Sequence, residues 1–147
     1  MARIVAGYPC PRKETGPVTS AANQNQTTDH QVLIRFLEDR FACAQACTEC
    51  ARVCALRASR ADPDGPAGTE RLRRKAVLCT EVCDATCRLL SEEARQDETG
   101  IRLQIEWCRT ICLECAQACQ GYEDASECAA ACRACARACT DFLATLN

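Results

Sequence analysis

The apolar positions of this chain recur at helical spacing, and in four segments cysteine occupies them. Segment 108–119 reads CRTICLECAQAC, with cysteines at steps of 4, 3 and 4 residues. Since an α-helix has about 3.6 residues per turn, these steps place four side chains on one face. The same steps recur in 43–54 and 128–139, and segment 79–87 carries cysteines at steps of 4 and 4. The pattern therefore predicts four helices, each with a cysteine-lined face.

Helix-breaking residues and capping residues predict where the helices begin and end. The first expected helix runs from Asp29 to about Arg60 and the second from Thr69 to about Gln96. The third ends at Gly121, and the fourth begins at Asp124 or Ser126 and runs to the C-terminus. Two prolines and a glycine in 62–66 cannot continue a helix. Short connections favour antiparallel neighbours, so we expect an all-α, antiparallel up-down-up-down four-helix bundle with a cysteine-lined core.

Two parts of the chain are distinguished by their composition. Residues 29–147 are expected to form the four-helix bundle domain. Residues 1–28 contain three prolines and no apolar periodicity, so we expect a disordered N-terminal tail. Cys10 lies in this tail as a free thiol, or alternatively as a flexible hook that captures metal.

Antiparallel packing should bring the conventional apolar residues of the helices to one end of the bundle. The residues expected to close this base are Leu33, Phe36, Leu90, Ile101, Ile105, Phe142 and Leu146. The opposite end, beside loops 61–68 and 120–124, is the mouth, where Cys54, Cys119 and Cys128 are expected to come close together.

Composition and charge narrow the classes of function. A chain of 147 residues with 18 basic and 20 acidic residues gives no reason to expect a nucleic-acid partner. The N-terminus lacks the apolar run of a secretory signal, and no segment has the roughly 18 apolar residues that would span a membrane. We therefore expect a cytoplasmic protein with reduced thiols and no membrane association, in which dense cysteines indicate metal or redox chemistry.

Several explanations of the cysteine pattern compete. Leucine or isoleucine would bury more apolar surface than cysteine, so packing alone does not select this pattern. Disulfides between helices are not expected in a reducing compartment. A zinc or iron–sulfur binding module remains an alternative, although structural zinc sites usually take their CxxC pairs from turns. A thiol redox sensor is the other alternative, but it would need one or two cysteines with a lowered pKa.

Monovalent copper fits the pattern best. The chain has 16 cysteines but one histidine and one methionine, so thiolate is its only abundant soft ligand. Each Cu(I) ion can displace one proton, and if thiolates bridge neighbouring ions the capacity is roughly one ion per helical cysteine, about 15 per chain. Because no other ionisable residue is expected on these faces, the pattern indicates a store and not an enzyme.

The repeated CxxxCxxCxxxC motifs over residues 30–145 resemble the family of cytosolic copper storage proteins. The resemblance implies a bundle that holds many Cu(I) ions along its interior and that associates into a homotetramer. A copper chaperone or a small-thiol copper donor is the expected partner. The ligands implied by the resemblance are Cys43, Cys47, Cys50, Cys54, Cys79, Cys83, Cys87, Cys108, Cys112, Cys115, Cys119, Cys128, Cys132, Cys135 and Cys139.

One departure from that family concerns histidine. Relatives tend to carry histidines near one end of the tube, around the third helix, where this chain has Trp107, Ile111, Gly121 and Tyr122. Its single histidine, His30, is expected to be solvated at a helix start. The resemblance therefore does not imply metal entry through imidazoles in this chain, and the rate of loading is expected to differ. Trp107 is expected in the core or at a subunit interface.

Overall fold

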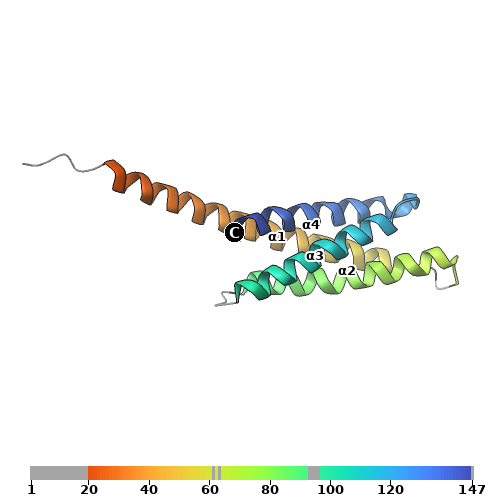
Figure 1. Cartoon of the computed structure of the whole chain (residues 1–147). Helices are drawn as coiled ribbons and strands as arrows, with labels where there is room; N and C mark the ends of the chain where they lie inside the picture. The colour runs from red at the N-terminus through yellow and green to blue at the C-terminus, as the bar shows by residue number, and fades with distance from the viewer. Residues whose placement is uncertain (1–19, 61, 63, 93–96, 147) are drawn as a thin grey trace, which may run out of the picture.

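The computed structural model is a bundle of α-helices, and it describes residues 20–60, 62, 64–92 and 97–146 (Figure 1). Its elements are α1 (Ser20–Ser59), α2 (Ala67–Ser91), α3 (Glu98–Ala118), the short 3₁₀ helix η1 (Glu123–Ala125) and α4 (Ser126–Thr145). Each long helix packs against its neighbour in sequence, and α1 also packs against α4. This arrangement confirms the predicted up-down-up-down bundle.

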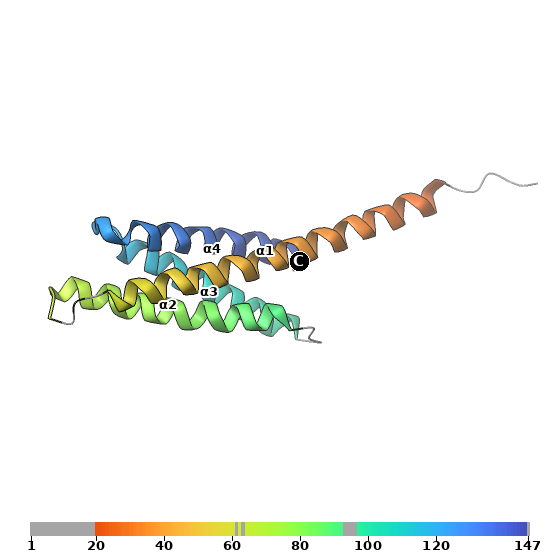
Figure 2. The same cartoon turned by 180° about the vertical axis from the view of Figure 1, so that it is seen from behind.

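Helix α1 is longer than its capping signals predict. It already includes Ser20, so residues 20–28, which the sequence pattern assigned to the tail, are helical, and Asp29 does not cap the helix. No proline or glycine interrupts 18–62, and Thr28 Oγ1 donates a hydrogen bond to the Gln24 carbonyl oxygen at 2.9 Å. The earlier part of the predicted tail, with Cys10, lies outside the described residues. Figures 1 and 2 show α1 projecting well beyond the other helices.

Helix α2 also differs from its predicted bounds. It begins at Ala67, after Pro66, so the predicted cap Thr69 lies inside the first turn. It ends at Ser91, several residues before the predicted end near Gln96. Proline fits the N-terminal boundary because its missing N–H would have no partner there in any case.

The connection between α3 and α4 is made by Gly121 and η1. Gly121 has φ of 86°, a conformation that glycine adopts without steric cost, and it confirms the predicted stop. Neither Asp124 nor Ser126 caps α4, because the N-cap position is Ala125 and no side chain bonds there. The turn of η1 instead leads the chain into α4, leaving the Asp124 side chain free for another partner.

The apolar base lies at the end of the bundle where α1 begins to project. The ring centroids of Phe36 and Phe142 are 5.6 Å apart, and Phe142, Leu90 and Ile105 are buried. Ile101 and Leu146 pack against this group while remaining partly buried. Leu33 is 54% exposed, so its predicted place in the base is wrong. It lies on the part of α1 that has already left the bundle.

Candidate metal centre

Fourteen cysteines line the bundle axis, each at most 3% exposed. They are Cys43, Cys47, Cys50, Cys54, Cys79, Cys83, Cys108, Cys112, Cys115, Cys119, Cys128, Cys132, Cys135 and Cys139. All four long helices contribute. In α1 and α4, and along α3 to Cys119, the 4-3-4 spacing advances 11 residues in about three turns and keeps the thiols on one face, and α2 adds Cys79 and Cys83, which are about one turn apart. The structure therefore brings together every predicted ligand except Cys87.

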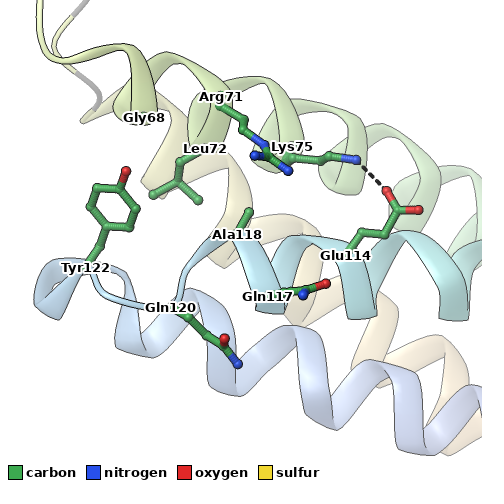
Figure 3. Close-up of a pocket in the computed structure, with 9 residues that line it drawn as sticks. All are labelled: Gly68, Arg71, Leu72, Lys75, Glu114, Gln117, Ala118, Gln120 and Tyr122. Carbon is green, nitrogen blue, oxygen red and sulfur yellow. Dashed lines mark hydrogen bonds and ion pairs between the residues drawn. The ribbon is translucent and has the colours of Figure 1, made fainter.

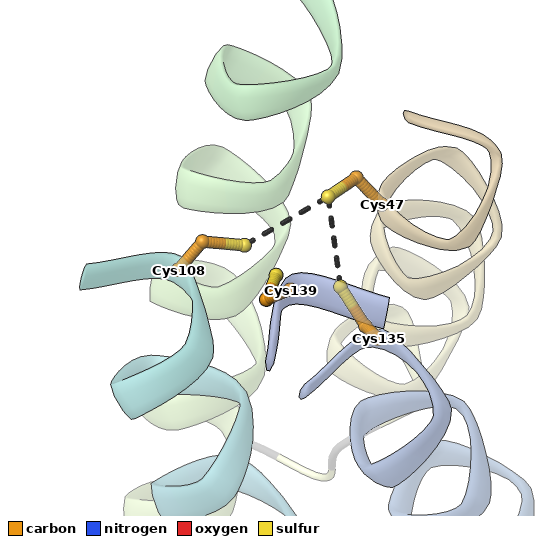
Figure 4. Close-up of side chains that lie close together, drawn as sticks. All are labelled: Cys47, Cys108, Cys135 and Cys139. Atoms are coloured by element: carbon orange, nitrogen blue, oxygen red, sulfur yellow. Dashed lines mark hydrogen bonds between the residues drawn. The ribbon is translucent and has the colours of Figure 1, made fainter. Parts of the chain in front are cut away.

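The sulfur atoms from different helices are neighbours without being bonded. Cys47 Sγ lies 3.9 Å from Cys108 Sγ and 3.6 Å from Cys135 Sγ, and these side chains point toward one another (Figure 4). Cys54 Sγ lies 3.5 Å from both Cys128 Sγ and Cys132 Sγ. A disulfide needs a separation of about 2.05 Å. The cysteines in the described part of the chain are free thiols.

These distances suit a shared metal ion. With metal–sulfur bonds of about 2.3 Å, as in zinc sites, two sulfurs on one ion lie at most about 4.6 Å apart. Four groups of four thiols come close to this limit, each with its sulfur atoms within 4.8 Å of one another. They are Cys47/Cys108/Cys135/Cys139, Cys50/Cys83/Cys112/Cys135, Cys50/Cys54/Cys79/Cys132 and Cys54/Cys115/Cys128/Cys132.

The four groups overlap along the axis. Cys135 and Cys50 each belong to two successive groups, and Cys54 and Cys132 join the last two. A thiolate shared between groups can bridge two ions. The arrangement is therefore a continuous ladder of soft ligands and not a set of isolated four-ligand sites.

Cys87 lies off this ladder, although the sequence pattern placed it on the inward face of α2. Thr86 is fully buried there, whereas Cys87 is only partly buried and lies 2.9 Å from Thr48 Oγ1. The step from Cys79 to Cys87 is 8 residues, which turns the side chain about 80° away from the stripe, whereas the 7 residues to Thr86 turn it only about 20°. The step of 3 residues from Cys83 to Thr86 continues the inward face, and this signal was missed in the sequence.

Arg57 is a second residue that sequence reasoning missed. Its side chain is 6% exposed beside the mouth, where Nη1 lies 3.2 Å from Asp124 Oδ2 and Nε has no partner within the described structure. It lines a small hollow together with Cys128. No periodic pattern marked Arg57, because a basic residue in the last turn of a helix is common on exposed surfaces.

The two thiols of the mouth differ in acidity. A hydrogen bond with Cys115 lowers the pKa of Cys119, but its bond with Cys128 and its burial outweigh this and raise the pKa to about 12. The bond with Cys115 raises the pKa of Cys128, whereas bonds with Cys119 and its other thiol neighbours lower the pKa to about 5. The mouth therefore pairs a protonated thiol with a thiolate, and the thiolate is the form that binds a soft cation.

Thiols at the base end also pair a lowered pKa with a raised pKa. Hydrogen bonds with Cys139 and Cys47 lower the pKa of Cys43 to about 5. The pKa of Cys139 is raised, chiefly by its hydrogen bonds with Cys108 and Cys135, and its burial adds to this. Neighbouring thiols thus share protons along the ladder, and each proton has to leave when a metal ion takes its place.

The remaining candidates lie away from the ladder. His30 is exposed on the projecting part of α1, as expected for a solvated residue. Trp107 is 50% exposed, so its predicted place in the core is wrong, and its alternative place at a subunit interface stays a prediction. Among the described residues, the buried side chains that are not hydrophobic or cysteine are Arg57 and Thr86. The axis therefore offers ligands for soft cations and few groups for acid–base catalysis.

Comparison with known proteins supports this chemistry. The sequence profile of the copper storage protein family matches residues 29–144. No curated protein matches the chain. Within the described residues, no helix combines the length and the apolar character needed to cross a membrane.

Solved structures of the copper storage protein Ccsp from Streptomyces lividans resemble this chain. One, a cytosolic copper storage protein with five coppers, is 32% identical, with a TM-score of 0.51 over 80% of this chain and 97% of that chain. Another, loaded with 10 copper equivalents, is 31% identical, with a TM-score of 0.51 over 88% and 93%. A histidine-to-alanine variant is 32% identical, with a TM-score of 0.52 over 80% and 97%.

Proposed function

The chain belongs to the copper storage protein family, and we propose that it stores Cu(I) by binding many ions to the thiolates of its axis. The observation that carries this proposal is the overlap of four buried groups of four thiols. Sulfurs that belong to two groups can bridge successive ions, as a dense store requires. All fifteen helical cysteines were predicted as ligands, and we now assign fourteen to the ladder and a peripheral place to Cys87.

Charge favours Cu(I) over a divalent ion. A zinc ion on four thiolates carries a net charge of about −2, which is costly in a dry core. A Cu(I) ion that displaces one proton adds no net charge, and it accepts two or three thiolates. With about one ion per ladder thiol, the capacity is about 14 ions. The role is storage and not catalysis.

Titration of the reduced protein with Cu(I), against a chelator of known affinity, tests the storage function. We expect saturation near about 14 ions per chain. Saturation at about four ions or fewer would contradict storage. A Zn²⁺ titration of the same sample separates the alternatives, because a zinc module would saturate at one Zn²⁺ ion per four thiols.

The proposal also covers where the protein works, how its copies assemble and what delivers its copper. We propose that the protein works in the cytosol, as the Streptomyces lividans relative does. We also propose a homotetramer in which other copies cover exposed apolar side chains of α1, such as Leu33, Leu37 and Phe41. The copper donor is proposed to be a chaperone or a small thiol. Sedimentation of the full chain tests the tetramer.

A further inference from the structure

A pocket of about 750 Å³ opens between the start of α2 and the end of α3, beside the mouth (Figure 3). We call it the α2–α3 pocket. Its floor is formed by Leu72 and Ala118, and its rim carries Arg71, Lys75 and Gln117. This volume lies in the range of small-molecule sites, which is about 300–1,000 Å³.

Small residues and one aromatic ring shape the pocket. Gly68 gives the Tyr122 side chain room to approach α2, because a Cβ at Gly68 would lie 2.2 Å from Tyr122 Oη. The Tyr122 ring thus forms an end wall, and Ala118 leaves the space beneath it open. The close approach of Tyr122 to Gly68 therefore defines one end of the pocket.

The polar groups of the pocket have unused hydrogen-bonding capacity. Lys75 forms an ion pair with Glu114, so these two charges compensate each other. Arg71 forms no ion pair or hydrogen bond with any residue that the structure describes, and the same is true of the Gln117 and Gln120 side chains. The pocket therefore has one uncompensated positive charge and two amides, a set that fits a carboxylate and peptide groups.

The pocket lies next to the entrance of the thiol ladder. Cys119 lies between two lining residues in the chain, Ala118 and Gln120, and its side chain is buried at the mouth. No histidine is available in this part of the chain to receive copper. Copper that arrives here must therefore pass from one thiolate to another.

We propose that the α2–α3 pocket binds the carrier that delivers copper, a small carboxylate-bearing peptide thiol in an anionic Cu(I) complex. This inference rests on the proposed storage function. Arg71 contacts the carboxylate, and Gln117 and Gln120 bind the peptide groups. The bound complex then lies next to the segment that carries Cys119, the thiol of the mouth nearest in the chain to the pocket.

The transfer is a ligand exchange that balances without an oxidant or reductant. A carrier complex of one Cu(I) and two thiolates meets two cysteines of the ladder. Two copper–sulfur bonds to the carrier break and two bonds to protein sulfur form, and each incoming cysteine that carries a proton passes it to a released carrier thiolate. Copper stays monovalent throughout, and the total charge is unchanged.

The test measures the initial rate of loading of the full chain from two probes. One probe is Cu(I) complexed by glutathione, which carries carboxylates and peptide bonds, and the other is Cu(I) complexed by 2-mercaptoethanol, which carries neither. Arg71→Glu should slow loading from glutathione about tenfold and change loading from 2-mercaptoethanol less than about twofold. Arg71 is exposed and unpaired, so the variant should keep its fold, as circular dichroism would verify.

A matched control separates the effect of the pocket on the loading rate from the effect of the overall charge of the protein. Arg133→Glu makes the same change of charge at an exposed position of α4 outside the pocket. It should leave both rates unchanged. Equal slowing in both variants, equal slowing with both probes, or no slowing in Arg71→Glu would each overturn the proposal.

A second variant changes the shape of the pocket without changing its charge. Ala118→Leu should fill the floor and slow loading from glutathione only; an unchanged rate would also overturn the proposal. The number of ions bound at saturation should stay the same in every variant. A low capacity in the unaltered protein would instead contradict the storage function, so the two failures are distinguishable.

Discussion

The guanidinium of Arg57 in α1 lies 3.2 Å from the carboxylate of Asp124 in η1, across the mouth of the thiol ladder. The arginine is 6% exposed and the aspartate 70%, so a buried charge is compensated by a partner that solvent can reach. The opposite end of the bundle is closed by packed apolar side chains around Phe142. The two ends therefore differ physically: packed apolar side chains close the base, whereas the mouth carries a charged pair with one buried member.

Removing the carboxylate of this pair should destabilise the bundle. Asp124→Asn leaves the Arg57 charge buried without compensation, and we expect a loss of about 1 kcal/mol in the free energy of unfolding. The control is Asp84→Asn, which breaks the pair of Asp84 with Arg88, where both side chains are largely exposed. The control should change stability by less than about 0.5 kcal/mol. Urea unfolding of the metal-free protein measures both, and equal effects would contradict the role of burial.

The position of Thr86 on the inward face of α2 can be tested by a variant that gains copper-binding capacity. Thr86→Cys places a thiol where the ladder lacks one, next to the apolar base, and we expect the copper capacity to rise by about one ion per chain. Cys87→Ser should leave the capacity of the ladder unchanged, because Cys87 is only partly buried and lies beside Thr48, away from the buried thiols of the axis. Titration with Cu(I) measures both variants. If Cys87→Ser lowered the capacity and Thr86→Cys did not raise it, the assigned face of α2 would be wrong.

The base should be the most sensitive part of the bundle to loss of volume. Phe142 is 1% exposed and its ring packs against Phe36, so Phe142→Ala should lower the free energy of unfolding by about 3 kcal/mol or more. Leu113→Ala, at a position that is 51% exposed, should cost less than about 1 kcal/mol. Thermal and urea unfolding of the two variants provide the comparison. A small effect of Phe142→Ala would show that the base does not hold the helices together.

The stability of the metal-free protein should depend on pH in a defined direction. The pKa of Cys43 and of Cys128 is lowered from an ordinary value of 9.0 to about 5, so the folded form loses these protons while the unfolded form retains them. Their contribution to stability is complete above about pH 9 and is lost as the pH falls through about 5. Cys119, with its pKa raised to about 12, contributes below about pH 9 and loses that contribution as the pH rises through 12.

Unfolding by urea at several pH values, with a reductant that contains no thiol, checks this dependence. We expect the free energy of unfolding to rise from about pH 5 to about pH 9. In Cys128→Ser the rise should be smaller, since one of the thiols with a lowered pKa is gone. A profile that falls over this range would contradict the lowered pKa values of Cys43 and Cys128.

Several features were predictable because they depend on one helix at a time. The 4-3-4 steps of cysteine in three segments place thiols on single faces, and these faces meet because each is the most apolar side of its helix. The breaks at 62–66 and at Gly121 follow from local backbone chemistry. Helical class, antiparallel order and a thiol-lined axis were therefore determined by the sequence alone.

Other features depend on how the helices meet, and only the tertiary structure decided them. Helix geometry places Thr86 nearer than Cys87 to the line of Cys79 and Cys83, but only the packing of the neighbouring helices makes this line the inward face of α2. Leu33 is exposed because it lies about two helical turns before Arg40, whose side chain already reaches the Leu90 carbonyl oxygen near the end of α2. The pairing of Arg57 with Asp124 and the pocket at Arg71 join segments far apart in sequence, and their geometry follows from packing that no local pattern encodes.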